Sequence, residues 1–144
     1  MTPGIEDLVR RGSVQRVPID TRAVDRLMRD AELHLDTASA ALGSGDLAAA
    51  FQLAYDAARK SLTALALSRG LRTKGEGAHV TLIDVVRTEL SDRSGVEVVG
   101  KLDRLRRTRN RAEYSGHWFD QDEIEDALTT SRAIVEWTAG IAPG

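Results

Sequence analysis

The sequence of 144 residues contains no cysteine, which excludes disulfide bonds and metal sites built on thiolates. Proline is scarce, and two of the three prolines, Pro3 and Pro18, lie within the first 18 residues, so the body of the chain is almost free of helix breakers. No run approaches the ~18 apolar residues of a membrane span, and the first residues lack the apolar core of a signal peptide. We therefore expect a cytoplasmic protein without a membrane segment.

Aromatic residues make up only 4% of the chain, so its core must be built from alanine, leucine, valine and isoleucine. These residues, apart from the β-branched pair, are strong helix formers. The chain also lacks a strong net charge: its formal net charge is −2 and its isoelectric point is about 5.9. These values argue against a uniformly basic protein that binds nucleic acid. Any electrostatic surface that attracts an anion must be local. The length is that of one domain with a single core.

The apolar pattern predicts an all-α, single-domain, up-and-down bundle of about five helices. Apolar residues recur at steps of three and four, the spacing of one helix face. No stretch shows the two-residue alternation of a strand. The expected helices are residues 21–42, 47–70, 80–90 and 96–113, and one that begins after Asp120.

The bundle is expected to span residues 21–141, and residues 1–20 are expected to form an N-terminal arm with a short helical piece near Ile5–Arg10. The segment "GSGD", residues 43–46, ends one helix and caps the next. Residues 70–77 include several glycines but lack the spacing of a phosphate-binding P-loop, so we expect a flexible connection there. Asp120 with Glu123 three residues later indicates a capping box at the last helix.

The stretch "RLRRTRNRAEYSGH", residues 104–117, places five arginines within eight residues. With roughly 100° per residue, Arg109 falls in the apolar stripe formed by Leu102, Leu105 and Ala112. The other side of this helix carries a basic ridge, which we define as Arg104, Arg107 and Arg111. One stretch therefore holds an inward-facing arginine and an outward-facing basic surface.

An arginine among aliphatic neighbours needs an explanation, because burying an unpaired charge costs several kcal/mol. Arg109 can pair with Glu113 one turn later, extend to the edge of the bundle, or face a cleft or subunit interface. The basic ridge is either a solvated helix face or a surface that follows RNA phosphates.

Three of the six aromatic residues, Tyr114, Trp118 and Phe119, follow the ridge directly. Such residues can stack on unpaired bases, so Trp118 joins the ridge as a candidate RNA-binding residue. The alternative is structural: Phe119 would pack on Ile124 as a hydrophobic staple, and Trp118 would fill the end of the bundle.

The segment "RNRAEY", Arg109 to Tyr114, resembles the signature of the HEPN superfamily, an arginine followed by asparagine or aspartate and then, after three more residues, histidine. The alanine-rich hairpin and this motif together resemble small actinobacterial HEPN proteins whose motif ends in Glu-Tyr. The resemblance covers residues 21–138 in topology.

This resemblance implies a homodimer in which the motif helices face each other around a shared cleft. Active members of the superfamily are metal-independent endoribonucleases, so no metal or other cofactor is expected. It further implies a role in RNA metabolism or in toxin–antitoxin or defence systems, commonly beside a partner of the nucleotidyltransferase type.

The chain departs from the signature where the histidine is expected, because Tyr114 stands there. In an enzyme, Arg109 would bind the scissile phosphate, Asn110 would orient it, and Glu113 or Tyr114 would take the proton-transfer role. A tyrosine with a pKa of about 10 is a poor base near neutrality, and a glutamate needs a raised pKa. The motif therefore leaves open an active nuclease, a non-catalytic RNA or partner-binding module, and a helical adaptor in which Arg109 is only an ion pair.

The chain has three histidines outside the motif, and each is expected to be a surface or structural residue. They are His34, His79 and His117. Two of them, His34 and His79, could also approach the cleft, but their spacing from the motif gives no reason to expect it.

Overall fold

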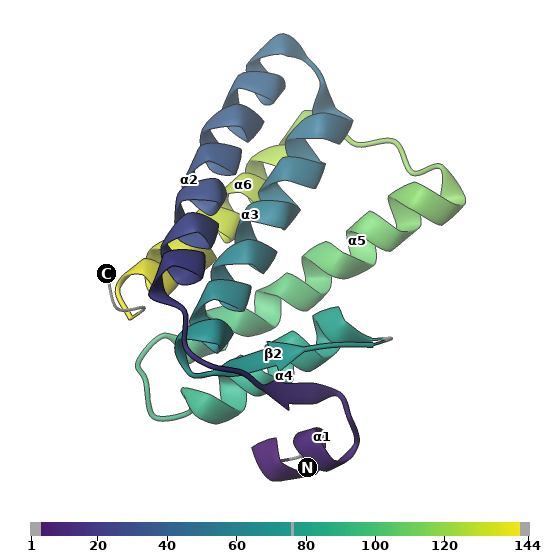
Figure 1. Cartoon of the computed structure of the whole chain (residues 1–144). Helices are drawn as coiled ribbons and strands as arrows, with labels where there is room; N and C mark the ends of the chain where they lie inside the picture. Colours follow the sequence, from purple (N-terminus) through teal and green to yellow (C-terminus); the bar gives the residue numbers. More distant parts are fainter. Residues whose placement is uncertain (1–3, 76, 142–144) are drawn as a thin grey trace.

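A computed structural model describes residues 4–75 and 77–141 and confirms the predicted all-α bundle. Helix α2 (Thr21–Ser44) and helix α3 (Leu47–Ser68) run side by side in opposite directions (Figure 1). Helix α6 (Gln121–Ala139) packs against both. Helix α3 is the central element, because it also contacts α4 (Ala78–Glu89) and α5 (Lys101–Ser115).

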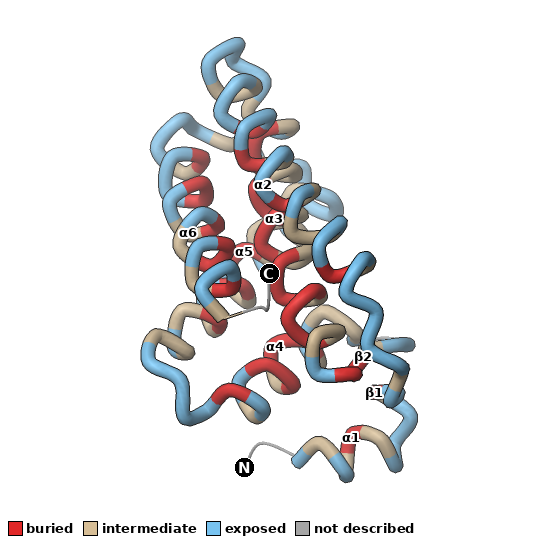
Figure 2. Tube along the Cα trace, turned by 60° about the vertical axis from the view of Figure 1, so that its left-hand side comes forward, coloured by how far each residue is buried: buried red, intermediate tan, exposed pale blue. Residues whose placement is uncertain are grey.

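Small side chains on α3 explain its central position. Alanine leaves room for close approach of neighbouring helices, and α3 carries six buried alanines. Between them lie the fully buried Leu62 and Leu65. Figure 2 shows buried positions along α3. The buried alanines of α3 are Ala50, Ala54, Ala57, Ala58, Ala64 and Ala66. Within the described part of the chain, no helix has both the length and the apolar character needed to cross a membrane.

Helix α5 begins five residues later than the spacing predicts. Residues Val96–Gly100 form a 3-10 helix, and the α-helix starts at Lys101 and continues to Ser115. Leu102 and Leu105 are buried as expected, and Val99 is buried within the 3-10 turn. In this turn the backbone N–H of Val98 donates to the carbonyl of Gly95 three residues earlier, the hydrogen-bond pattern of a 3-10 helix and not of an α-helix.

The expected flexible connection at residues 70–77 is wrong in part, because Leu71–Thr73 forms strand β2. It pairs antiparallel with β1 (Val14–Arg16), and Val14 lies opposite Thr73. Strands of three residues are too short to show a clear two-residue alternation, which is why the sequence gives no sign of them. The short helix α1 (Ile5–Arg10) precedes this pair, and Leu8 and Val14 join the core cluster.

The helix ends follow the predicted capping chemistry. The Asp120 side chain accepts from the backbone N–H of Glu123, and the Glu123 side chain accepts from the backbone N–H of Asp120, which confirms the capping box. At the α2–α3 turn, Gly45 has a φ of 85°, a left-handed conformation that favours glycine. Asp46 then accepts from the backbone N–H of Ala49 at the start of α3.

Candidate functional site

Arg109 lies on the side of α5 that faces the bundle, and its side chain is 28% exposed. Its Nη2 lies 3.3 Å from Oε1 of Glu113. This distance exceeds the 2.7–2.9 Å that is typical of a charge-assisted hydrogen bond. The Nε of Arg109 is buried and has no hydrogen-bond partner among the described residues. Glu113 therefore neutralises part of the guanidinium charge but does not satisfy all of its donors.

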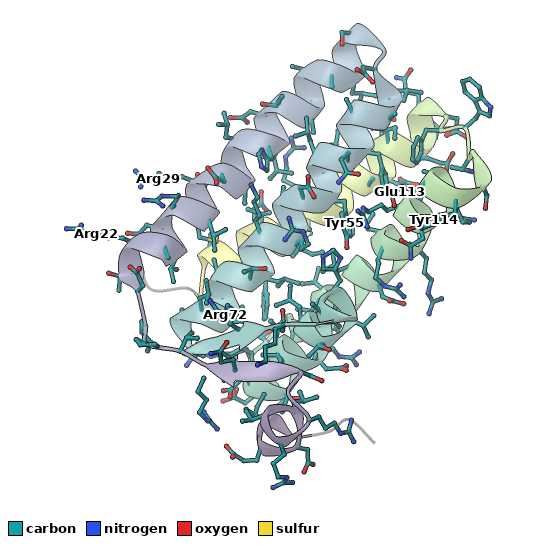
Figure 3. All side chains as sticks on the ribbon, turned by 45° about the vertical axis from the view of Figure 1, so that its right-hand side comes forward. Arg22, Arg29, Tyr55, Arg72, Glu113 and Tyr114 are labelled. Atoms are coloured by element: carbon teal, nitrogen blue, oxygen red, sulfur yellow. The ribbon has the colours of Figure 1, made fainter. Side chains whose placement is uncertain are left out.

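Tyr55 of α3 connects Arg109 to a histidine on another helix. The guanidinium carbon of Arg109 lies 5.5 Å from the centre of the Tyr55 ring, within the range of a cation–π contact. The Tyr55 hydroxyl oxygen lies 2.7 Å from Nδ1 of His79. Tyr55 is 1% exposed, so its position is fixed by the core (Figure 3 labels it beside Glu113). Three helices thus bring Arg109, Tyr55 and His79 together.

A pocket of about 300 Å³ opens beside this group. Helix α5 contributes Arg106, Arg109 and Asn110 to its wall, and the opposite wall includes His79. The remaining lining residues belong to the loop before α4 and to its first turn: Gly75, Gly77, Ala78 and Val80. Two guanidinium groups, an amide and an imidazole around one cavity form a surface suited to a phosphate or another oxyanion.

His79 also borders a second pocket of about 300 Å³ on its other side. This second pocket is lined by Arg59 of α3 and Arg72 of β2, together with Thr63 and Thr73. Arg72 is exposed and donates to the side chain of Gln15. His79 therefore stands between two adjoining cavities, each of which carries arginine side chains.

Burial and charge set the protonation of the central pair. Burial lowers the pKa of His79, and the positive charges of Arg59, Arg109 and Arg106 lower it further. Burial also raises the pKa of Tyr55, although the same arginines oppose this change. At neutral pH the proton is therefore held by the tyrosine, and the imidazole is neutral. We assign the Tyr55 O–H as the donor to Nδ1 of His79, which places the ring proton on Nε2.

The chain also matches the model of a known domain family. The model of the HEPN domain matches residues 24–141, which is most of the chain. The chain belongs to the HEPN family. The matched residues include most of α2 and every later element through α6, and the segment Arg109–Tyr114, which resembles the signature of the family, lies on α5. A comparison with curated proteins gives no match.

The predicted site residues of the HEPN motif do not all meet in one place. Arg109 and Asn110 line the pocket together, and Glu113 lies beside them through its contact with Arg109. Tyr114 is 83% exposed and does not border this pocket. Within one chain, Tyr114 and Arg109 therefore do not converge.

The candidate RNA-binding residues are all on the surface. The three arginines of the basic ridge are exposed, and Arg107 also pairs with Asp103 at 2.9 Å. Trp118 is 91% exposed, so the structural alternative that it fills the end of the bundle is wrong. Phe119 is partly buried there and packs against the core, and its ring stacks on that of Phe51 at a centroid distance of 4.8 Å.

Sequence reasoning missed the position of His79. The expectation of a surface or structural role fits His34, which contacts Lys60, and His117, which contacts Glu123. His79 has a partner in the buried Tyr55, which also fits that expectation, and it borders the Arg109 pocket as well, although 30 positions separate His79 and Arg109 in the sequence. No spacing rule links His79 and Arg109, because they lie on two different helices, α4 and α5.

Proposed function

We propose that this HEPN domain binds RNA and that Arg109 contacts a backbone phosphate in the pocket between α4 and α5. The observation that carries the proposal is the combination of Arg106, Arg109 and Asn110 around a cavity of about 300 Å³. A guanidinium group matches two phosphate oxygens at once, and the loose contact with Glu113 leaves donors available for such a ligand.

In the catalytic form of this proposal, the protein is a metal-independent endoribonuclease. A ribose 2′-oxygen loses its proton and attacks the adjacent phosphorus, and the bond to the 5′-oxygen breaks. The 5′-oxygen gains a proton as it leaves, and a 2′,3′-cyclic phosphate remains. Arg109 stabilises the negative charge on the phosphoryl oxygens, and Asn110 orients the group. Glu113 or Tyr114 takes the proton-transfer role. Glu113 is the nearer of the two within one chain, because it contacts Arg109.

We further propose that the protein acts as a homodimer through the Arg109 face of α5. A two-fold arrangement would bring Tyr114 of one protomer towards the pocket of its partner, which a single chain does not do. The basic ridge and the exposed Trp118 would then follow the RNA strand on either side of the cleft. We place the protein in RNA metabolism or in a toxin–antitoxin or defence system, with a nucleotidyltransferase-type protein as a candidate partner.

A helical adaptor without RNA binding is the second candidate, and one observation favours it. Arg109 has a partner in its own chain, because Glu113 lies 3.3 Å away on the next helical turn. An adaptor would use that ion pair only for stability and would bind neither RNA nor free phosphate through the pocket.

Incubation with RNA in the absence of divalent metal separates these possibilities. Purified protein and an Arg109→Ala variant are mixed with total RNA, and fragments are tested for cyclic phosphate ends. Cleavage that depends on Arg109 supports the nuclease. Salt-sensitive binding without cleavage supports a binding module. If the wild-type protein neither binds nor cleaves RNA, the proposal is wrong and the adaptor is favoured.

A further inference from the structure

We propose that His79 of α4, held in place by Tyr55, hydrogen-bonds the RNA phosphate together with Arg109 and becomes protonated when the phosphate binds. This inference rests on the proposed function, since it concerns the same pocket. It assigns the site a histidine that comes from a different helix and lies outside the motif of α5.

The geometry carries the first step of this inference. His79 borders the pocket that contains Arg106 and Arg109, and it also borders the adjoining pocket that contains Arg59 and Arg72. A phosphodiester strand that crosses from one pocket to the other passes over the imidazole ring. His79 is thus placed to contact a polyanion between two pairs of arginines.

The second step concerns the orientation of the ring. Nδ1 is occupied by the buried hydroxyl of Tyr55 at 2.7 Å, and Nε2 has no hydrogen-bond partner among the described residues. Tyr55 is held by the core and also supports the Arg109 guanidinium at 5.5 Å. One buried side chain therefore positions both groups that would contact the phosphate. Tyr55 is a positioning residue, because it reaches the ligand only through Arg109 and His79.

The charges around His79 make its protonation depend on the ligand. Among the described residues, the titratable and charged groups that face it are Tyr55, Asp56 and Arg59 of α3, Arg72 of β2, and Arg106 and Arg109 of α5. The surrounding arginines disfavour a further positive charge while the pocket holds no anion. A bound phosphate supplies negative charge in the same place, so it favours the imidazolium.

The Tyr55–His79 pair can hold both charge states if the hydrogen of the Tyr55 hydroxyl turns, while the oxygen and the ring stay in place. In the neutral state, the Tyr55 O–H donates to Nδ1 and the Nε2–H faces the ligand. When a proton is added, it resides on Nδ1, and the Tyr55 oxygen accepts from it because a hydroxyl is both donor and acceptor. Nε2–H donates to the phosphate in either state, and the added proton comes from solvent.

Proton NMR of the imidazole ring tests the inference directly, because the chain has only three histidines. The probe is a 2′-O-methyl oligouridylate, which cannot be cleaved by attack of the 2′-oxygen and whose charge is constant between pH 5.5 and 8. The expected result is that the pKa of His79 rises when the oligonucleotide binds, while His34 and His117 shift little. An unchanged pKa for His79 in the saturated complex would overturn the inference.

Affinity measurements with matched variants provide the second readout. If binding raises the pKa of His79 by about one unit, wild-type affinity increases by up to about tenfold as the pH falls from 8 to 5.5. His79→Gln keeps an N–H donor but cannot be protonated, so its affinity is expected to lose this pH dependence. His34→Gln, which changes a histidine paired with Lys60, is expected to retain it.

A Tyr55→Phe variant tests the positioning role. Phenylalanine keeps the ring beneath Arg109 and removes the hydroxyl, so the fraction of the Nε2–H tautomer, measured by nitrogen-15 NMR of His79, is expected to fall. An unchanged tautomer in a folded Tyr55→Phe variant would contradict the role assigned to Tyr55.

Failure of the inference can be distinguished from failure of the proposed function. Suppose that Arg109→Ala weakens oligonucleotide binding, but the affinity of His79→Gln depends on pH as strongly as that of the wild type. The inference then fails, and the proposal of RNA binding stands. If Arg109→Ala binds as tightly as wild type, the proposed function fails, and the inference fails with it.

Discussion

Glu113 lies one helical turn after Arg109, and its Oε1 lies 3.3 Å from Nη2 of Arg109. Arg109 in turn lines the pocket that we assign to phosphate. The same carboxylate can play two opposed parts. It competes with phosphate for Arg109, and it is the nearest motif residue that can accept a proton.

Replacement of Glu113 separates these two parts. Glu113→Gln removes a competing negative charge, so binding of the uncleavable oligonucleotide is expected to strengthen by about two- to fivefold, in line with a partly exposed ion pair worth below about 1 kcal/mol. If Glu113 is the base, cleavage of ordinary RNA is expected to fall by about 10²- to 10⁴-fold in the same variant. Fluorescence anisotropy and gel analysis measure the two effects.

The control for this variant is Glu136→Gln, which makes the same change of net charge on the exposed side of α6. It is expected to alter neither binding nor cleavage. Weaker oligonucleotide binding by Glu113→Gln would contradict competition at Arg109.

Trp118 is expected to contribute to RNA binding without contributing to stability. Its side chain is 91% exposed, so Trp118→Ala removes little buried surface and should leave the free energy of unfolding within about 0.5 kcal/mol of wild type. Base stacking on an aromatic ring is worth about 1–3 kcal/mol, so affinity for single-stranded RNA should fall at least about fivefold. Leu33→Ala, at an exposed apolar residue of α2, is the control. Equal affinities for the two variants would remove Trp118 from the RNA surface.

Folding stability is expected to depend on pH through His79. Burial and the nearby arginines lower the pKa of His79 in the folded state, so below about pH 6.5 the unfolded chain binds more protons than the folded chain. Stability from this group is therefore fully present above pH 6.5 and is lost as the pH falls towards the lowered pKa. Urea denaturation of His79→Gln should show a smaller loss between pH 7 and 5.5 than the wild type. Parallel curves for the two proteins would contradict the pKa direction.

The N-terminal arm is expected to contribute to the core. Leu8 is 4% exposed and belongs to the core cluster, so Leu8→Ala should lower the free energy of unfolding by about 2–5 kcal/mol. Ile19 lies in the same arm but is 60% exposed, and Ile19→Ala should cost less than about 1 kcal/mol. Urea denaturation monitored by circular dichroism measures both. Similar costs would show that the arm is not packed as described.

The features that depend on local chemistry were predicted from the sequence. The bundle follows from three- and four-residue apolar spacing, and the capping box follows from Asp120 and Glu123. The inward direction of Arg109 follows from its place in the apolar stripe of α5. Each of these depends on neighbours a few residues apart, which the sequence displays directly.

The features that depend on distant contacts were not predicted. The β1–β2 pair joins segments 57 residues apart through strands too short to show alternation. The approach of His79 to Arg109 depends on how α4 and α5 pack around Tyr55, a buried residue of a third helix. In the segment before α6, Phe119 packs against the core through its ring stack on Phe51, and Trp118 is exposed.

The salt dependence of RNA binding tests most directly whether Arg109 contacts a phosphate. Affinity for the 2′-O-methyl oligouridylate is measured by fluorescence anisotropy between low and moderate salt for wild type, Arg109→Ala and Arg29→Ala. Arg29 is an exposed arginine that projects from α2, away from α5 (Figure 3), and serves as the control. A phosphate contact at Arg109 predicts weaker binding and a logarithmic salt slope reduced by about 0.7 for Arg109→Ala alone. Equal affinity and equal slope for Arg109→Ala and wild type would contradict it.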